Sequence, residues 1–191
     1  MAISASRGDL PGPGRPGART TGEGDIGVDH LVVGLSGSPA SRRALAWALG
    51  QVERRGHGGP GGWVEPVTVW PLAGGVVVHQ VPGHFCVARD EAARAQAEAL
   101  AAVGPADGRH LRITPRLENG TVADVLADAS AGAGLLVLGV GHPLVDGAVA
   151  RRTLTDAVLR RWADRWGTPQ GCPLVLVDPG GRARLLESIG V

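Results

Sequence analysis

The sequence predicts an α/β protein built on a doubly wound, Rossmann-like parallel sheet with helices on both faces. Two observations support this fold class. Short apolar segments alternate with longer segments of helical periodicity, and several of the helical segments begin at recognisable capping residues. This alternation places a helix between consecutive parallel strands, joined by right-handed crossovers. The chain has 191 residues, of which 43% are hydrophobic, and this is enough for one domain with a substantial core.

Five strands are predicted, and two of them have distinctive patterns. Leu135–Gly139 begins as a continuous apolar run, which is typical of a central strand buried on both faces. His110–Leu117 alternates polar and apolar residues and contains Pro115, which indicates an edge strand. The predicted strands cover residues 30–35, 64–70, 110–117, 135–139 and 173–177.

Four helices are predicted between these strands. The first has Ser38 as its N-cap and Pro39 at its first helical position, which is a strong start signal. The third starts at Thr121, and Asp124 takes the place of the usual Glu in a capping box. The predicted helices cover residues 39–55, 90–103, 121–129 and 153–166.

The chain divides into three parts by composition. Residues 1–27 are rich in Gly and Pro and have no apolar periodicity, so they are predicted to be a disordered leader. Residues 28–178 contain all the predicted strands and helices and form the folded domain. Residues 179–191 are predicted to be a C-terminal tail.

Charge and composition exclude several classes of function. The formal net charge is +1, so no overall field attracts nucleic acid or an anionic membrane. The chain has no lysine, which removes Schiff-base chemistry and the lysine of a Walker-type phosphate loop. No segment resembles a secretory signal or a membrane span, and the two cysteines form no motif, so we expect a cytoplasmic protein without a metal site.

The candidate site is the segment that follows the predicted strand Leu135–Gly139. Gly139 and Gly141 are expected to take positive φ and to let the backbone approach a ligand closely. Thr153 can cap the next helix and direct its hydroxyl to an anion, and Arg152 can clamp a phosphate there. A buried strand that leads through glycines to a helix N-terminus is typical of a phosphate-binding loop.

The spacing of this segment resembles the nucleotide loop of the universal stress protein family, G-x2-G-x9-G-[ST]. Gly139 takes the first position of that pattern and Thr153 the last, whereas His142 and Arg152 replace the second and third glycines. Three further blocks are also similar to that family, in the same order. They are DHLVVGLSGSPASRRALAWAL at residues 29–49, ENGTVADVLADASAGAGLLVLGVG at residues 118–141 and GCPLVLV at residues 171–177.

The resemblance implies a strand order of 3-2-1-4-5 and an ATP site at the switch point between the first and fourth strands. Ser36 would then lie beside the loop, where ATP-binding members of the family usually carry an aspartate. The implied ligand-binding residues are Ser36, Gly139, Gly141, His142, Arg152 and Thr153. ATP is the cofactor if these departures from the pattern are tolerated, and otherwise no cofactor is expected.

The resemblance therefore predicts a stress-response binding protein with a degenerate nucleotide loop and no catalytic residues. Two alternatives stay open: an ATP-binding stress sensor with a modified site, and a nucleotide hydrolase of the wider adenine-nucleotide α-hydrolase-like group. A homodimer is implied, with Pro173–Val177 as the edge strand that pairs with its twofold mate. Trp162 and Trp166 either pack on the sheet or form a surface for a protein partner.

Overall fold

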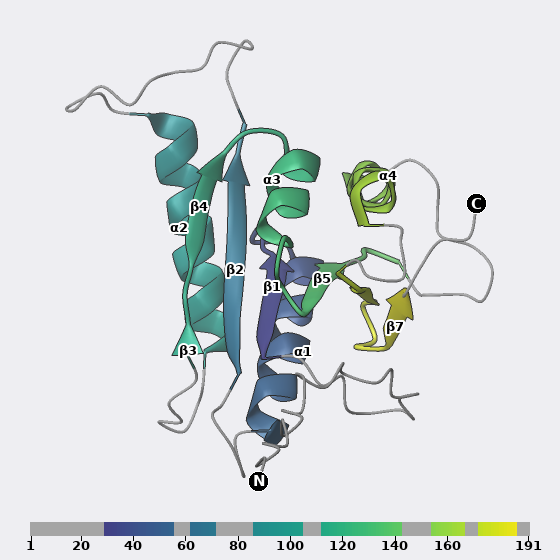
Figure 1. The fold of residues 1–191 in the computed structure, drawn as a ribbon. Helices are drawn as coiled ribbons and strands as arrows, with labels where there is room; N and C mark the ends of the chain where they lie inside the picture. Colours follow the sequence, from purple (N-terminus) through teal and green to yellow (C-terminus); the bar gives the residue numbers. More distant parts are fainter. Residues whose placement is uncertain are drawn as a thin grey trace, which may run out of the picture.

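The computed structural model describes residues 29–55, 62–71, 86–104, 112–142, 154–166 and 172–186. These residues form a central sheet with helices on both faces, as predicted (Figure 1). The predicted leader, residues 1–27, lies outside the described residues. No helix among those described is long and apolar enough to cross a membrane.

The sheet is mostly parallel and has seven strands. The strands are β1 (His30–Gly34), β2 (Trp63–Trp70), β3 (Arg112–Ile113), β4 (Arg116–Asn119), β5 (Leu135–Gly139), β6 (Leu174–Val177) and β7 (Ala183–Leu186). Their order is β3-β2-β1-β5-β6-β7, and β4 also pairs with β2. The prediction of five strands in the order 3-2-1-4-5 was therefore wrong in the number of strands and at both edges of the sheet.

One edge differs because the predicted strand 110–117 is divided in two. β3 pairs with Trp63 and Val64, and β4 pairs with β2 from Val67 onward. Alternate residues of this segment donate to β2, as the N–H of Thr114 does to the Val64 carbonyl at 2.9 Å, and in this register the next donor would be the N–H that Pro66 lacks. Gln96 compensates from the neighbouring helix: its amide nitrogen donates to the carbonyl of Pro66 at 3.4 Å and to that of Arg116 at 2.8 Å.

The other edge differs because the predicted tail, residues 179–191, contains a strand. β7 pairs antiparallel with β6, through a turn that Asp178 stabilises. The Asp178 carboxylate accepts hydrogen bonds from the backbone N–H groups of Gly180 and Arg182, at 2.8 and 2.9 Å. Gly181 has a φ of +80°, which favours glycine in such a turn. The edge of β6 is consequently occupied, and Pro173–Val177 is not the edge strand that the dimer prediction required.

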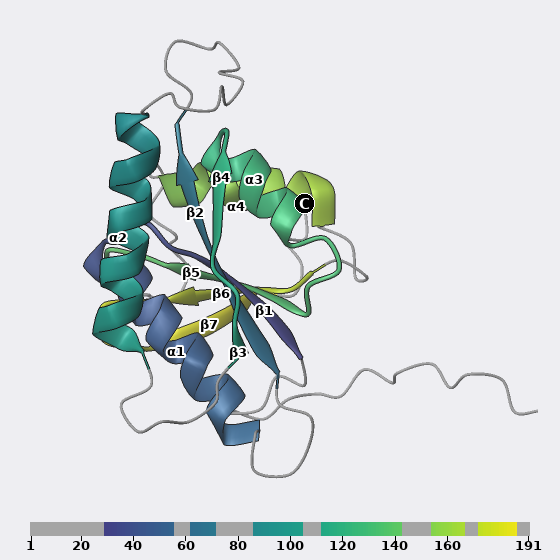
Figure 2. The same cartoon turned by 90° about the vertical axis from the view of Figure 1, so that its left-hand side faces the viewer.

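Two helices lie on each face of the sheet, as Figure 2 shows from the side. α1 (Pro39–Arg55) and α2 (Val87–Val103) cover one face, and α3 (Val122–Ala129) and α4 (Leu154–Trp166) cover the other. Alternate strand residues divide between two buried clusters. Leu31, Val33 and Val137 pack toward α1, whereas Val32, Leu136 and Leu176 pack toward α3 and α4.

The predicted helix starts at Ser38 and Thr121 are confirmed. The Ser38 hydroxyl accepts a hydrogen bond from the N–H of Ser41 at 3.2 Å, and Pro39 is the first residue of α1. Thr121 accepts from the N–H of Asp124 at 3.2 Å, and the Asp124 carboxylate returns to the Thr121 hydroxyl at 2.6 Å. These caps fix the N-termini of α1 and α3.

Trp162 packs inside the domain and offers no surface to a partner. It is fully buried between α4 and the sheet, and its indole N–H donates to the carbonyl of Cys172 at 2.7 Å. Of the two alternatives for Trp162, the structure has packing on the sheet, and this side chain closes the apolar core under α4. The side chain of Trp166 lies outside the described residues.

Candidate functional site at the switch point of the sheet

The switch point lies between β1 and β5, which are adjacent parallel strands with helices that leave toward opposite faces. Sheets of this kind bind ligands beyond the carboxyl ends of the strands at such a point. A cavity of about 110 Å³ is found there, under α3 and α4. It is lined by Gly34, Leu35, Ser36, Val67, Val69, Val122, Leu126, Leu138, Gly139 and Val158.

The structure brings together two of the predicted site residues and leaves others undescribed. Ser36 and Gly139 both line the cavity, as the switch-point argument predicts. Gly141 and His142 follow β5 but are not among the lining residues. Arg152 and Thr153 lie outside the described residues, so their predicted roles stay predictions.

Gly139 is required by packing, and it does not have the positive φ that we predicted. It is the last residue of β5, and a Cβ built on it would overlap the carbonyl of Ala40 and approach the nitrogen of Ser41 to 2.8 Å. The first turn of α1 therefore crosses directly against the backbone of β5. Gly141 also lacks positive φ, and a Cβ there would meet nothing within 4 Å. Only Gly139 thus has a structural need for glycine.

Ser36 belongs to a small cluster of hydroxyls at the start of α1. Its hydroxyl donates to Ser38 at 3.0 Å and to Ser41 at 3.3 Å, and its backbone N–H donates to the Ser41 hydroxyl at 3.2 Å. Ser41 donates onward to the backbone carbonyl of Ser38 at 3.0 Å. The cluster fastens the β1–α1 loop to the helix N-terminus, so the Ser36 hydroxyl already has partners.

Two buried nitrogens near the switch point have no hydrogen-bond partner among the described residues. They are Nε of Arg42, in the first turns of α1, and Nε2 of His142, which follows β5. A buried donor without a partner is costly and calls for an explanation. Neither side chain lines the cavity.

The described residues of the cavity fit an apolar group better than a nucleoside triphosphate. Its walls are formed by Val and Leu side chains and glycine backbone, and Ser36 supplies the single side-chain hydroxyl. A phosphate placed there would lose its hydration without charged donors from the lining residues. The volume is also below the usual range of small-molecule sites, about 300–1,000 Å³.

Sequence reasoning missed most of the cavity. Val67, Val69, Val122, Leu126 and Val158 come from β2, α3 and α4, and each belongs to an ordinary apolar pattern. Aliphatic side chains form no motif, so no local signal distinguishes a lining residue from a core residue. The alternation within β2 does place Val67 and Val69 on one face, but not beside a cavity.

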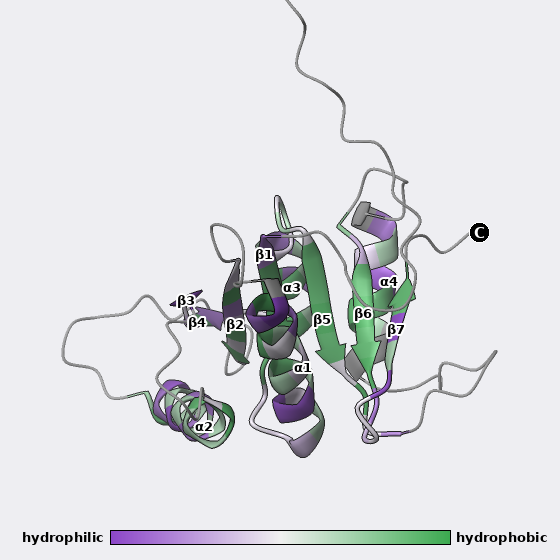
Figure 3. Ribbon diagram, turned by 90° about the horizontal axis from the view of Figure 1, so that it is seen from below, coloured by the Kyte–Doolittle hydropathy of each residue, from purple (hydrophilic) through white to green (hydrophobic). Residues whose placement is uncertain are grey.

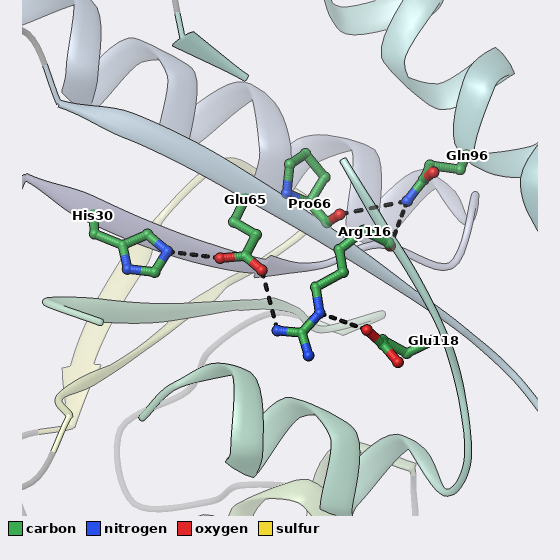
Figure 4. Close-up of polar contacts among 6 residues, drawn as sticks. All are labelled: His30, Glu65, Pro66, Gln96, Arg116 and Glu118. Atoms are coloured by element: carbon green, nitrogen blue, oxygen red, sulfur yellow. Dashed lines mark hydrogen bonds and ion pairs between the residues drawn. The ribbon is translucent and has the colours of Figure 1, made fainter. Parts of the chain in front are cut away.

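A second polar group, at the amino end of the same sheet face, was also missed. Glu65 accepts from Nε2 of His30 at 2.9 Å and from Nη1 of Arg116 at 3.3 Å, as Figure 4 shows. Arg116 also donates from Nε to Glu118 at 2.7 Å, and the hydrogen bond to Glu118 is the main cause that raises the pKa of Arg116. The unexpected signal in the sequence was the Glu within the apolar strand WVEPVTVW.

This amino-end cluster is explained by folding. The ring of His30 stacks on that of Trp63 at 3.7 Å between centroids, and Arg112 lies over the same indole at 5.7 Å. These contacts join β1, β2, β3 and β4 on the part of the sheet that α3 does not reach (Figure 1). Each charged group has an opposite charge or an aromatic ring beside it, and the cavity lies at the other end of the strands.

Comparison with solved structures finds a similar fold. The structure matches that of a protein from the universal stress protein family from Burkholderia pseudomallei, with a TM-score of 0.50 and 23% identity over 81% of this chain and 98% of that chain. The chain has the universal stress protein fold. No protein-family model matches the sequence, and the search of curated proteins finds no significant match.

Two other universal stress proteins match less well. One was solved in complex with cAMP; its TM-score is 0.42, with 21% identity over 70% of this chain and 90% of that chain. The other is from Archaeoglobus fulgidus; its TM-score is 0.40, with 19% identity over 70% of this chain and 40% of that chain.

Proposed function

We propose that this chain is a universal stress protein that acts by binding, without turnover, through a switch-point site that is no longer a standard ATP site. The fold and the four sequence blocks in their family order support the assignment. The departures at Ser36, His142 and Arg152 support the loss of the standard site.

The lining of the switch-point cavity is the observation that carries this proposal. Its walls are aliphatic, and the Ser36 hydroxyl is held by Ser38 and Ser41. Gly139 serves the contact between β5 and α1, so its presence does not argue for a phosphate. No described group of the cavity is a general base or a nucleophile with a base beside it, which supports binding over hydrolysis.

The proposal includes a homodimer, with β7 in place of Pro173–Val177 at its interface. β7 is the last strand of the described sheet, and a last strand offers backbone groups to a second copy. Its residues are Ala183–Leu186, and the hydrogen-bonded register with β6 runs from Leu174 to Val177. Size-exclusion chromatography with light scattering at micromolar concentration checks the dimer, and a monomer contradicts it.

A second candidate, an ATP-binding sensor with a modified site, is favoured by one observation. Arg42 Nε and His142 Nε2 are buried without partners among the described residues, on two segments that meet at the switch point. Both can donate to an anion, so a phosphate outside the cavity would satisfy them.

Titration calorimetry with Mg-ATP decides between the two candidates. We compare the full chain with a variant in which Ser36→Asp, His142→Gly and Arg152→Gly restore the family pattern. We expect the parent to bind weakly or not at all and the restored variant to bind about 10-fold tighter or more, equivalent to a hydrogen bond to a charged group, ~1–2 kcal/mol. Arg160→Gly, an exposed position on α4, is the control and should leave ATP binding unchanged.

Tight binding of ATP by the parent would contradict the proposal and support the modified sensor. Loss of ATP on incubation, faster than in buffer and absent after heat denaturation, would support a hydrolase. If neither the parent nor the restored variant binds ATP, the loop has a structural role and binding must use another ligand.

A further inference from the structure

The cavity under α3 and α4 has a fixed shape. The backbone of Gly34 and Gly139 lies at its floor, Val67 and Val69 line it from β2, and the two helices form its roof. Arg161 on α4 pairs with Asp124 on α3, at 2.7 Å from Nε to Oδ1, and so joins the two helices over the sheet. The Thr121 cap holds the first turn of α3 in place.

Close packing at the floor and short side chains on the walls leave the space in the cavity unfilled. A Cβ on Gly34 would come within 2.8 Å of the Leu138 side chain and 3.1 Å of the Leu126 side chain, so these leucines already pack on the floor. The valines that complete the walls are short and have restricted χ1 rotamers. They cannot extend into the remaining volume as a longer side chain would.

The chemistry of the walls selects for an apolar occupant. A bound water needs two to four polar partners, and the one hydroxyl in the lining, that of Ser36, is engaged with Ser38 and Ser41. The cavity's volume of about 110 Å³ is of the same order as that of an apolar protein cavity of ~150 Å³ that binds benzene.

We propose that this cavity binds a compact apolar group about the size of a benzene ring. This inference rests on the proposed function, because a standard ATP site would place a nucleotide at the same switch point. It goes further by naming the ligand class: an unsubstituted or alkyl-substituted ring, or the ring end of a larger molecule, with no charge on the part that enters. Ser36, which is exposed, marks the rim through which such a group would enter.

Methyl NMR of the full chain tests the inference, with benzene as the probe. We expect saturable shifts of the valine and leucine methyls that line the cavity and no shift of Val87, which is exposed at the start of α2. Val69→Phe fills the cavity from a strand position that favours aromatic residues and should weaken benzene binding at least 10-fold. Val87→Phe makes the same change outside the cavity and should leave the affinity within 2-fold of the parent.

A further variant and a second probe keep the test decisive. If Val69→Phe does not fold, Val122→Phe fills the cavity from the half-buried first residue of α3 and carries the same expectation. Benzoate carries a charge on the same ring and should bind at least 10-fold more weakly than benzene, because the lining residues offer it no charged donor. Benzoate that bound as tightly as benzene would overturn the assignment of an apolar ligand.

The outcomes separate this inference from the proposed function. No saturable methyl shift with benzene, together with no response to Mg-ATP, overturns the inference and leaves the degenerate nucleotide site standing. Mg-ATP that shifts the cavity methyls and displaces benzene overturns the proposed function. If Val69→Phe or Val122→Phe binds benzene as tightly as the parent, benzene binds outside the cavity, and this outcome also overturns the inference.

Discussion

The two ends of one sheet face differ sharply in chemistry. At the carboxyl ends of the strands, α3 and α4 cover an aliphatic cavity beside the switch point. At the amino ends of β1–β4, the same face carries His30, Trp63, Glu65 and Arg116. Figure 3, seen from the amino-end side, shows hydrophobic β5 and β6 on one side of β1 and β2 and hydrophilic β3 and β4 on the other. The end that is rich in titratable groups is the one that needs them for folding.

The difference has its origin in helix length and placement. α3 has eight residues and covers only the carboxyl-end part of β1 and β2, so the amino-end part must provide its own polar surface. α4 runs back along β5 and β6 as far as Cys172, where Trp162 closes the core. In this chain the charged cluster therefore serves the packing of the sheet, and the cavity lies away from it.

The largest expected effect is at Gly139, where α1 packs directly on the backbone of β5. Gly139→Ala should destabilise the fold by about 3 kcal/mol or more, because the new Cβ overlaps the Ala40 carbonyl and backbone must shift. Gly141→Ala is the matched control from the same predicted loop, with open space around it and ordinary φ. Urea denaturation measures both, and similar values for the two variants would mean that α1 does not cross β5 so closely.

Sequence reasoning predicted the parts of this fold that depend on local signals. The caps at Ser38 and Thr121 and the buried strand at Leu135 are each specified by a few neighbouring residues. β7 was missed because ARLL is short, contains an arginine and has only half-buried leucines, although the DPGG turn before it is a hairpin signal.

The site was harder to predict than the fold for a physical reason. Ser36 and Gly139 were placed correctly because strand order alone brings the ends of β1 and β5 together. The need for glycine at position 139 comes from Ala40, about a hundred residues earlier in the chain, and no local pattern reports such a contact. The cavity likewise depends on how far aliphatic side chains from five segments reach, which sequence periodicity does not determine.

The second effect concerns the apolar side of the comparison, at Cys172. Burial raises the pKa of the Cys172 thiol to about 11 from its ordinary value of 9.0, and a backbone hydrogen bond to Leu136 partly opposes this. Since the folded pKa is the higher one, the protonated thiol stabilises the fold fully below pH 9. That contribution is lost as pH rises from 9 to 11, by roughly 1–2 kcal/mol.

The composition of the chain makes this pH window easy to interpret. There is no Lys and no Tyr, so no ammonium or phenol side chain titrates in the window in which the Cys172 thiol loses its proton. Urea denaturation at pH 8.5, about half a unit below the ordinary thiol pKa, and at pH 11, the raised pKa of Cys172, measures the loss of stability. Cys172→Ala should remove the pH dependence, whereas Cys86→Ala, at a half-buried position, should retain it. If the unfolding free energy of Cys172→Ala fell with pH as steeply as that of the parent, another group would be responsible for the loss.

The smallest effect tests the polar end and the claim that its charges serve folding. Glu65→Gln keeps the shape of the side chain but removes the charge that faces both His30 and Arg116, so we expect a loss of about 1 kcal/mol. The loss is limited because Arg116 is 42% exposed and keeps its contact with Glu118. Glu118→Gln, at the exposed end of the same chain of contacts, should cost less than about 0.5 kcal/mol.

Urea denaturation at neutral pH gives both values, and benzene binding measured on Glu65→Gln should match the parent. If Glu65→Gln kept its stability but no longer bound benzene, the charged cluster at the amino end would influence the cavity at the carboxyl end. The two ends of the sheet face would then not be separate in folding and binding.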